Sequence, residues 1–247
     1  MRYFIKLQYD GSKHHGWQSQ PTDIPTIQGD IEKAFSKILR QKIEVVGCGR
    51  TDTGVHARDY YMHVDLEHLD WKLMGRVNRL LSDNIALLNF QKVDEEAHTR
   101  FDASSRSYEY HIHFKKNPFL NGKSYLFPYQ RFDRDKMQES VAMLKNYTHF
   151  DTFCKSNTDV IEKVCTITRS EWIFDKEGAV YYVSANRFLR GMIRLIVGMS
   201  MQVGRGQMEI DYVKKQLANQ ERLEKALSAP AHGLYLCDIE YPYIGKE

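Results

Sequence analysis

The sequence has few cysteines for its length, and none of them forms a recognisable motif. Its four cysteines (Cys48, Cys154, Cys165 and Cys237) are widely spaced in 247 residues and include no C-x-x-C pair. This spacing argues against a zinc site and against a disulfide framework. We therefore expect four buried or half-buried free thiols.

A long apolar run is also missing. The longest apolar stretch, near residues 188–203, is interrupted by Arg190 and Arg194, and residues 1–11 alternate between apolar and polar side chains. The sequence thus predicts neither a membrane span nor a signal peptide, and we expect a cytoplasmic protein with no membrane partner.

The chain carries almost no excess of one charge. It has 35 Lys and Arg against 32 Asp and Glu, a formal net charge of +3. Such a balance identifies no partner, so a nucleic-acid surface would have to come from local clustering. With 42% hydrophobic and 27% charged residues, the composition excludes collagen, coiled coil and wholesale disorder. The length predicts one large or two small domains.

What is present is a regular alternation of strands and helices in the first half. Apolar residues alternate with polar ones over 2–9, 43–48, 59–66 and 85–93, which predicts four strands. Helical spacing follows Thr26, a plausible N-cap, and recurs from Asp70 or Trp71 to Leu81. The resulting order is βαββαβ, typical of a ferredoxin-like unit.

The same order returns after a basic, turn-prone linker at 98–106. Strands are predicted from Tyr108, at 163–173, at 178–186 and at 234–241, with helices at 134–145, at 188–202 and after Asp211. The linker therefore predicts a domain boundary. We expect an α+β chain of two ferredoxin-like halves with antiparallel sheets, residues 1–105 and 106–247.

The loop GRTDTGVHA at 49–57 is the first candidate for chemistry. Arg50 lies two residues before Asp52, between glycines that allow a sharp bend. One interpretation is an Asx-turn, because Asp, Thr and Gly are common in tight turns. The other is a cleft carboxylate that the arginine keeps ionised, as a nucleophile requires. The triplet also spells the aspartic-protease motif, but it occurs once, and an adjacent arginine would disrupt a shared proton.

Basic clustering is the second candidate. No Asp or Glu occurs between Gly178 and Met208, and the predicted helix from 188 would carry on one face Arg187, Arg190 and Arg194. A cationic stripe without acidic partners is typical of a phosphate-binding surface, although a solvated helix face is the plainer interpretation. Rings such as Trp17, Phe101 and Tyr108 are able to stack on an unpaired base.

Other stretches predict no cofactor. The segment VGRGQ at 203–207 has two glycines but lacks the strand-then-helix context of a phosphate loop. No residues have the spacing of a metal site. We assign neither a metal nor a nucleotide cofactor.

Several blocks of the sequence match a known family. They are YDGSKHHGWQSQ (9–20), TIQGDIEKAF (26–35), GRTDTGVHA (49–57), RFDASSRSYEYHI (100–112), FLRGMIRLIVG (188–198) and HGLYL (232–236). In these blocks, which span nearly the whole chain, the protein resembles the TruA-type tRNA pseudouridine synthases. The resemblance implies a metal-free isomerase that converts tRNA uridines to pseudouridine, with the pseudouridine synthase fold around a central basic cleft and a homodimeric assembly.

The same resemblance implies roles for individual residues. Asp52 matches the catalytic nucleophile and Arg50 its partner, Tyr108 the tyrosine that stacks on the target base, and Arg194 the arginine that pairs with the nucleophile. Leu234 matches the apolar wall of the pocket. Further substrate-binding candidates are Tyr110, Trp17 and His56 and, from the basic stripe, Arg190 and Arg187.

Departures from the family pattern bear on the choice of substrate. Asp59 and Tyr60 replace a usual Gly-Gln pair, Ala97 to Arg100 replace Phe-His-Ala-Arg, and Leu81-Ser82 replaces Leu-Pro. None removes a residue matched to catalysis. The best-known relatives modify positions 38, 39 and 40 of the anticodon stem-loop, and the same positions are expected here.

Two other classes of function compete with this interpretation. A non-catalytic pair of RNA-binding modules would explain the basic stripe and the aromatic residues, but not the coexistence of Arg50, Asp52, Tyr108 and Arg194. A hydrolase would need a water-activating base or metal, which the pattern lacks. The synthase interpretation accounts for all these features together. The route remains open among attack at C1′, attack at C6 and formation of a glycal.

Overall fold

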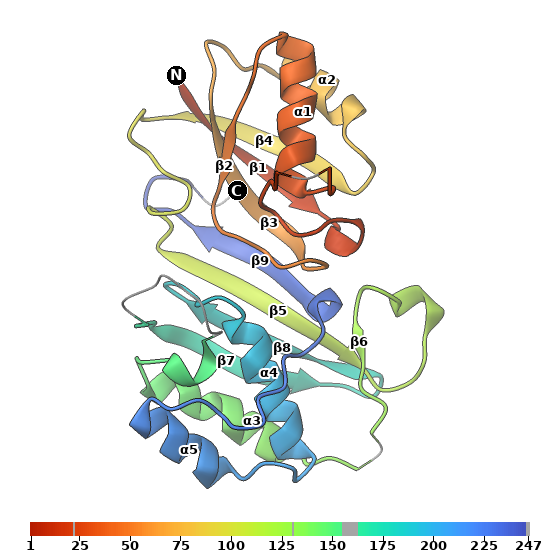
Figure 1. Ribbon diagram of the computed structural model, residues 1–247, viewed down its shortest axis with the longest axis vertical. Coiled ribbons are helices and arrows are strands. Elements are labelled where there is room, and N and C mark those ends of the chain that lie inside the picture. Colours follow the sequence, from red (N-terminus) through yellow and green to blue (C-terminus); the bar gives the residue numbers. More distant parts are fainter. Residues whose placement is uncertain (22, 130, 155–162, 246–247) are drawn as a thin grey trace. The chain divides into compact units, whose positions relative to one another are not determined.

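The computed structural model describes residues 1–21, 23–129, 131–154 and 163–245 (Figure 1). Contacts divide the chain into two compact units, Met1–Ser104 with Tyr235–Glu247, and Ser105–Leu234. Within the described ranges the chain forms five α-helices and mostly antiparallel strands. The mixed helix and strand composition expected from the sequence is confirmed.

The first unit is a sheet covered by helices. Its elements are β1 (Arg2–Tyr9), α1 (Ile27–Leu39), β2 (Val45–Gly47), β3 (His56–Asp65), α2 (Trp71–Leu80), β4 (Ile85–Val93) and most of β9 (Leu234–Glu240). β1 pairs antiparallel with β4 and with β3, and β2 pairs antiparallel with β3. β9 joins the start of β3 in parallel, with His56 opposite Tyr235.

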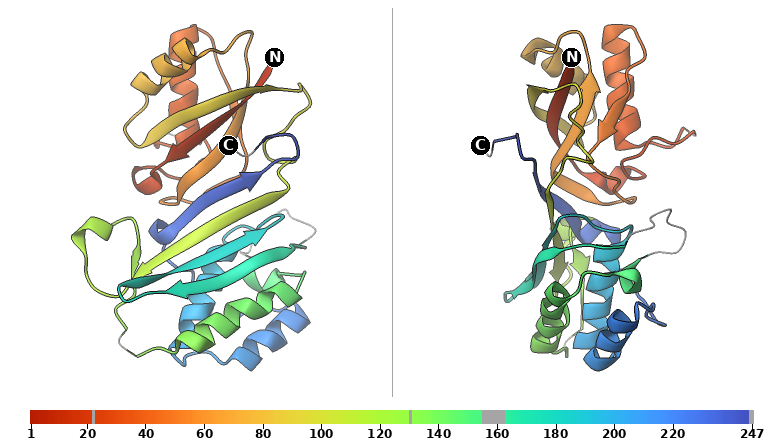
Figure 2. Two further views of the ribbon diagram at one scale, coloured as in Figure 1. Left: turned by 180° about the vertical axis from the view of Figure 1, so that it is seen from behind. Right: turned by 90° about the vertical axis from the view of Figure 1, so that its left-hand side faces the viewer.

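Sequence periodicity explains the core of this unit. The alternation in β1 buries Ile5 and Leu7, and that in β3 buries Tyr60 and Met62 opposite them. The helix α1 starts where the Thr26 hydroxyl accepts a hydrogen bond from the backbone N–H of Gly29, and it buries one apolar face. In Figure 2, right, α1 and the C-terminal segment lie on opposite sides of the strands of this unit.

The second unit consists of strands and of helices that pack against them. Its elements are β5 (Ser105–His113), β6 (Tyr125–Leu126), α3 (Arg134–Ala142), β7 (Ile167–Phe174), β8 (Gly178–Ala185), α4 (Met192–Gly204) and α5 (Ile210–Asn219). β8 pairs antiparallel with β5 and with β7, and β6 runs parallel to β5. A hydrogen bond of 2.9 Å from Trp172 Nε1 to Ser200 Oγ joins β7 to α4, and Ser200 Oγ donates to the carbonyl of Met137 in α3.

The last strand groups with the first unit from Tyr235 onward, whereas the repeat in the sequence counted it with the second half. The reason is visible in its contacts. The ring of Tyr241 packs edge-on against Phe4 at 5.3 Å, and its hydroxyl donates a hydrogen bond of 2.6 Å to the carbonyl of Thr99.

The start of α4 corrects one prediction. The pattern predicted a helix from residue 188, but α4 begins at Met192. Gly191 has a φ of 72°, a left-handed conformation that an α-helix does not contain. Only Arg194 therefore lies on the helix, and the predicted helical stripe of three arginines is wrong. Arg187 and Arg190 instead lie exposed in the segment before it.

Candidate active site

The loop that carries Arg50 and Asp52 is held at both sides by aromatic residues of the first unit. The hydroxyl of Tyr60, in β3, donates a hydrogen bond to the carbonyl of Gly49. The backbone N–H of Trp17 donates to the carbonyl of Thr51 at 3.3 Å, and the hydroxyls of Tyr9 and Thr51 are 2.9 Å apart. These contacts fix the backbone on either side of Arg50.

Asp52 starts a tight turn. The N–H of Val55 donates to the carbonyl of Asp52 at 3.1 Å, and Gly54 has a φ of 80°. A positive φ at the third position is typical of a type II turn, which favours glycine there. Because a backbone hydrogen bond closes the turn, the half-buried carboxylate of Asp52 is held on a defined backbone while Arg50 is exposed.

Two glycines let the segment after β1 pack directly against this loop. A Cβ at Gly16, whose φ is 85°, would overlap the carbonyl oxygen of Thr51, and one at Gly11 would overlap that of Val55. Close approach of two backbones requires glycine at such positions. Sequence analysis missed this supporting role, although both glycines lie in the matched block 9–20.

Trp17 and His56 lie inside the first unit. Trp17 is 3% exposed and stacks on Tyr60, with 4.2 Å between ring centroids. Nδ1 of His56 lies 3.0 Å from Asp10 Oδ1, and the imidazole stacks on Tyr235 at 4.6 Å. Substrate binding by these two residues stays a prediction. Their contacts, Trp17 with Thr51 and His56 with Asp10, help to position the loop.

In the second unit, β5 presents Tyr108 and Tyr110 at alternate positions. Tyr108 is half-buried and meets the ring of Phe188 edge-on at 5.3 Å. Tyr110 is fully buried, and its hydroxyl donates a hydrogen bond of 2.8 Å to the carbonyl of Pro230. Burial, more than the neighbouring Tyr125, raises the pKa of Tyr110, so its hydroxyl remains a donor at neutral pH.

Arg194 is anchored near the same segment of the second unit. Its Nε donates a hydrogen bond of 2.7 Å to the carbonyl of Ala229, and the N–H of Ala229 donates to the carbonyl of Arg194 at 2.9 Å. Leu234, which follows a short 3₁₀ turn (Ala231–Gly233), is buried. The pair of hydrogen bonds fixes the plane of the guanidinium and the course of the chain toward Leu234. No pattern in the sequence pointed to Ala229.

The structure thus groups the predicted site residues within each unit. In the first unit it brings together Arg50, Asp52, Trp17 and His56 around one loop. In the second it gathers on β5, on α4 and at the first residue of β9 the residues Tyr108, Tyr110, Arg194 and Leu234.

Comparison with known proteins identifies the family. A family model described as tRNA pseudouridine synthase matches residues 147–242. The tRNA pseudouridine synthase A of Bacteroides fragilis is 42% identical over 98% of this chain and 96% of its own, and that of Porphyromonas gingivalis is 41% identical over 98% and 97%. The chain belongs to the tRNA pseudouridine synthase A family. This is a family of isomerases, and its member from Bacillus pumilus is 36% identical over 98% of this chain and 99% of its own.

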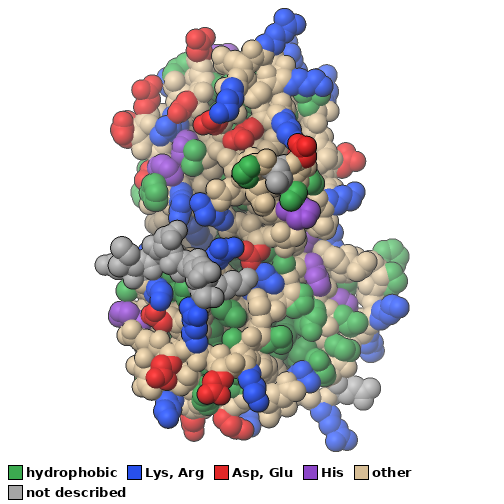
Figure 3. Space-filling model, viewed as in Figure 1, with side chains coloured by type: hydrophobic (Ala, Val, Ile, Leu, Met, Phe, Trp, Pro, Cys, Tyr) green, Lys and Arg blue, Asp and Glu red, His purple; other side chains and the backbone are tan. Residues whose placement is uncertain are grey.

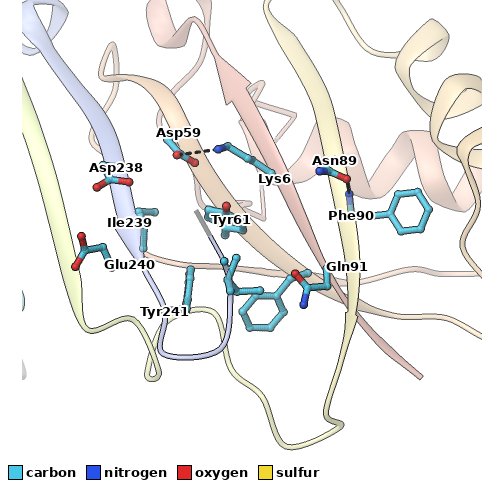
Figure 4. A pocket seen from close by; sticks show the side chains of 13 residues that line it. Lys6, Asp59, Tyr61, Asn89, Phe90, Gln91, Asp238, Ile239, Glu240 and Tyr241 are labelled. Atoms are coloured by element: carbon cyan, nitrogen blue, oxygen red, sulfur yellow. Dashed lines mark hydrogen bonds and ion pairs between the residues drawn. The ribbon is translucent and has the colours of Figure 1, made fainter. Parts of the chain in front are cut away.

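A separate pocket of about 240 Å³ lies in the first unit (Figure 4), and the charge of its lining decides whether it suits an RNA backbone. Its lining includes one lysine, Lys6, against three carboxylates, Asp59, Asp238 and Glu240. Asp59 and Lys6 form an ion pair at 3.2 Å, yet burial raises the pKa of Asp59. Because three carboxylates against one lysine make the lining negative, the pocket repels phosphate and is unsuited to an RNA backbone.

Three further features concern the described residues, 1–21, 23–129, 131–154 and 163–245. No group of three or more His, Cys, Asp or Glu side chains in these residues could hold a metal ion. None of the helices in the same residues is long and apolar enough to cross a membrane. The cysteines are free thiols as expected, Cys237 half-buried and the other three buried.

Proposed function

We propose that the protein isomerises uridine to pseudouridine in tRNA and that Asp52 is the nucleophile. The observation that carries this proposal is the 42% identity over 98% of the chain to a tRNA pseudouridine synthase A. The defined turn at Asp52 supports it, because a nucleophile must be held in a fixed position relative to its target.

The reaction exchanges one glycosidic bond for another. The bond between N1 and C1′ breaks, the base turns, and C5 bonds to C1′ while the C5 proton is lost and N1 gains a proton. Asp52 acts by attack at C1′, by attack at C6 or by assisting loss of the 2′ proton. In every route Arg50 and Arg194 favour the ionised carboxylate, which lowers the cost of its charge.

The other residues serve binding of the base and the RNA. The target uridine must leave its stack, and stacking on Tyr108 offsets that cost while its hydroxyl assists proton transfer. Leu234 forms the apolar wall and Tyr110 supports it. Arg187 and Arg190 are exposed cations suited to phosphate groups.

The finer features of the assembly belong to the same proposal. We infer modification at positions 38, 39 and 40 of the anticodon stem-loop, a homodimer, a cytoplasmic location and no required metal or cofactor. Two ferredoxin-like domains with a basic cleft, divided near residue 105, are supported by the antiparallel order β4-β1-β3-β2 in the first unit and β5-β8-β7 in the second.

The test uses tRNA transcripts with tritium at C5 of uridine. Incubation with the protein in EDTA should release tritium to water, since C5 loses its hydrogen only when it becomes the glycosidic carbon. Asp52→Asn should abolish release and keep tRNA binding, whereas Asp83→Asn, at an exposed aspartate of the same unit, should change neither.

Two results would contradict the proposal. Loss of tRNA binding in Asp52→Asn would make Asp52 a structural residue. Absence of tritium release by the unaltered protein from every tRNA, with binding intact, would favour a non-catalytic RNA-binding protein. Sequencing the modified tRNA then tests the positions.

A further inference from the structure

A group of polar aromatic side chains and one arginine lies on the second unit around β6, and none of them belongs to the candidate active site. Its members, which we call the aromatic-arginine surface, are Tyr125, Tyr129, Arg205 and His232. All four are partly exposed, Tyr129 to 37%. Figure 3 shows hydrophobic side chains gathered on this side of the second unit, near β6 and α4 as they are labelled in Figure 1.

The fold holds these side chains in place. Tyr125 lies in β6, opposite Ile112 of β5, and the carbonyl of His113 accepts a hydrogen bond of 2.8 Å from Phe127. The ring of Phe127 packs against Tyr129 with 4.9 Å between centroids. The backbone from Tyr125 to Phe127 is therefore held to β5.

Arg205 comes from a different element. It follows the last residue of α4, and its guanidinium lies 3.6 Å from the centre of the Tyr129 ring. A cation at a helix C-terminus is favoured by the helix dipole, and over a ring it gains a cation–π interaction. The arginine in VGRGQ thus has a defined position, although that segment is no phosphate loop.

His232 lies in the 3₁₀ turn that follows Ala229, the residue whose carbonyl accepts the hydrogen bond from Arg194 Nε. Its ring lies 6.2 Å from that of Tyr125 in an edge-on arrangement. Burial, together with the charges of His113 and Arg194, lowers the pKa of His232. A neutral imidazole at pH 7 offers one donor and one acceptor, which suits the polar edge of a nucleobase.

The polar groups of this surface are not used by the protein itself. In the part of the chain that the structure describes, the hydroxyls of Tyr125 and Tyr129, the His232 nitrogens and the Arg205 guanidinium make no hydrogen bond or ion pair with other residues. Elsewhere in this unit Arg169 also lies over a tyrosine, Tyr182, at 4.3 Å, but its Nε pairs with Glu171 at 2.7 Å.

We propose that the aromatic-arginine surface binds an unpaired nucleotide of the RNA next to the target uridine. The tyrosines supply rings for stacking, Arg205 a cation for phosphate, and His232 hydrogen bonds for a base edge. Because His232 lies three residues after Ala229, which holds Arg194, we place this nucleotide beside the target, and in this respect the inference rests on the proposed function.

The first test separates the ring from its hydroxyl. With a tRNA transcript that releases tritium, Tyr125→Leu should raise KM and Kd roughly 10-fold with kcat nearly unchanged, because a base–aromatic stack is lost. Tyr125→Phe should retain binding. Arg205→Gln should weaken binding and flatten its salt dependence, whereas the matched control Arg169→Gln should leave both unchanged.

The second test pairs protein and RNA changes. Two stem-loops are compared, one that lacks the base just before the modified uridine and one that lacks the base just after it. The unaltered protein should bind one of these two RNAs roughly 10-fold more weakly than the complete stem-loop. Tyr125→Leu should bind that RNA no more weakly than the unaltered protein does. Additive losses at both positions, or unchanged binding by Tyr125→Leu with an unchanged melting temperature, would overturn the inference. Tritium release by the unaltered protein tests the proposed function separately.

Discussion

Trp17 stacks on Tyr60 with 4.2 Å between ring centroids and 27° between ring planes. The backbone of Trp17 holds the carbonyl of Thr51, and the hydroxyl of Tyr60 holds that of Gly49. One aromatic pair thereby restrains both neighbours of Arg50, in the loop that leads to the proposed nucleophile. The position of that loop thus depends on residues that do not touch substrate.

Tyr60→Phe tests this dependence. The change keeps the stack and removes the donor to Gly49, so the free energy of unfolding should fall by about 1 kcal/mol. A looser loop should lower kcat several-fold at constant KM. Urea unfolding and tritium release measure the two effects. In the control Tyr3→Phe, which loses a bond of 4.0 Å to the weak acceptor Met1 Sδ, neither quantity should change; equal effects in both variants would contradict the prediction.

Gly16→Ala should disrupt the same loop from the other side. A left-handed φ of 85° is strained for alanine, and its Cβ would overlap the Thr51 carbonyl, so a loss of about 2 kcal/mol or more is expected together with most activity. Gly75→Ala is the control. Gly75 lies within α2 with open space around its Cβ, so alanine should stabilise the protein by about 0.5–1 kcal/mol. Melting temperatures and kcat of the two variants are the measurements. A Gly16→Ala protein that stays stable and active would refute the prediction.

Much of the fold could be predicted because its determinants are local. Thr26 caps α1 as predicted, and the helices expected from Asp70 or Trp71 and from residue 134 begin at Trp71 and Arg134. In each case the side chain of the preceding residue, Asp70 or Asp133, accepts a hydrogen bond from the backbone of the first turn. The start of α4 could not be predicted, because a left-handed glycine at Gly191 leaves the helical spacing of the neighbouring arginines intact while interrupting the helix itself.

The site was only partly accessible from sequence. The turn at Asp52 and Gly54 follows from local turn chemistry. The burial of Trp17 and His56 depends instead on which distant residues surround them, Tyr60 in one case and Tyr235 in the other. The roles of residues in the second unit came from the family resemblance, because no local pattern relates them to Asp52.

Stability should fall at acidic pH because of His63. This histidine is 5% exposed, and burial, with Arg2 and His98 nearby, lowers its pKa to about 4. The unfolded chain, with an ordinary pKa near 6.5, therefore takes up the proton first as pH falls. Stability is retained above about pH 6.5 and lost progressively toward pH 4, by about 3 kcal/mol in total.

Urea unfolding at several pH values checks this expectation against two variants. His63→Asn should unfold with a flatter dependence on pH between 6.5 and 4, because the group that protonates in the unfolded chain is gone. His68→Asn is the matched control, since that side chain is 75% exposed. An unchanged slope in His63→Asn would assign the acid sensitivity to other groups, such as His98, whose pKa burial also lowers.

Arg194→Lys should separate charge from orientation at the proposed active site. Lysine keeps the positive charge but lacks the Nε–H that bonds the Ala229 carbonyl, so the cation loses its fixed plane. We expect kcat to fall roughly 100-fold, as for loss of one preorganised donor, with tRNA affinity changed little. Arg169→Lys, at an exposed arginine of β7, should leave kcat unchanged. If Arg194→Lys retains full kcat with intact folding, charge alone suffices, and the bond to Ala229 has no part in positioning the guanidinium.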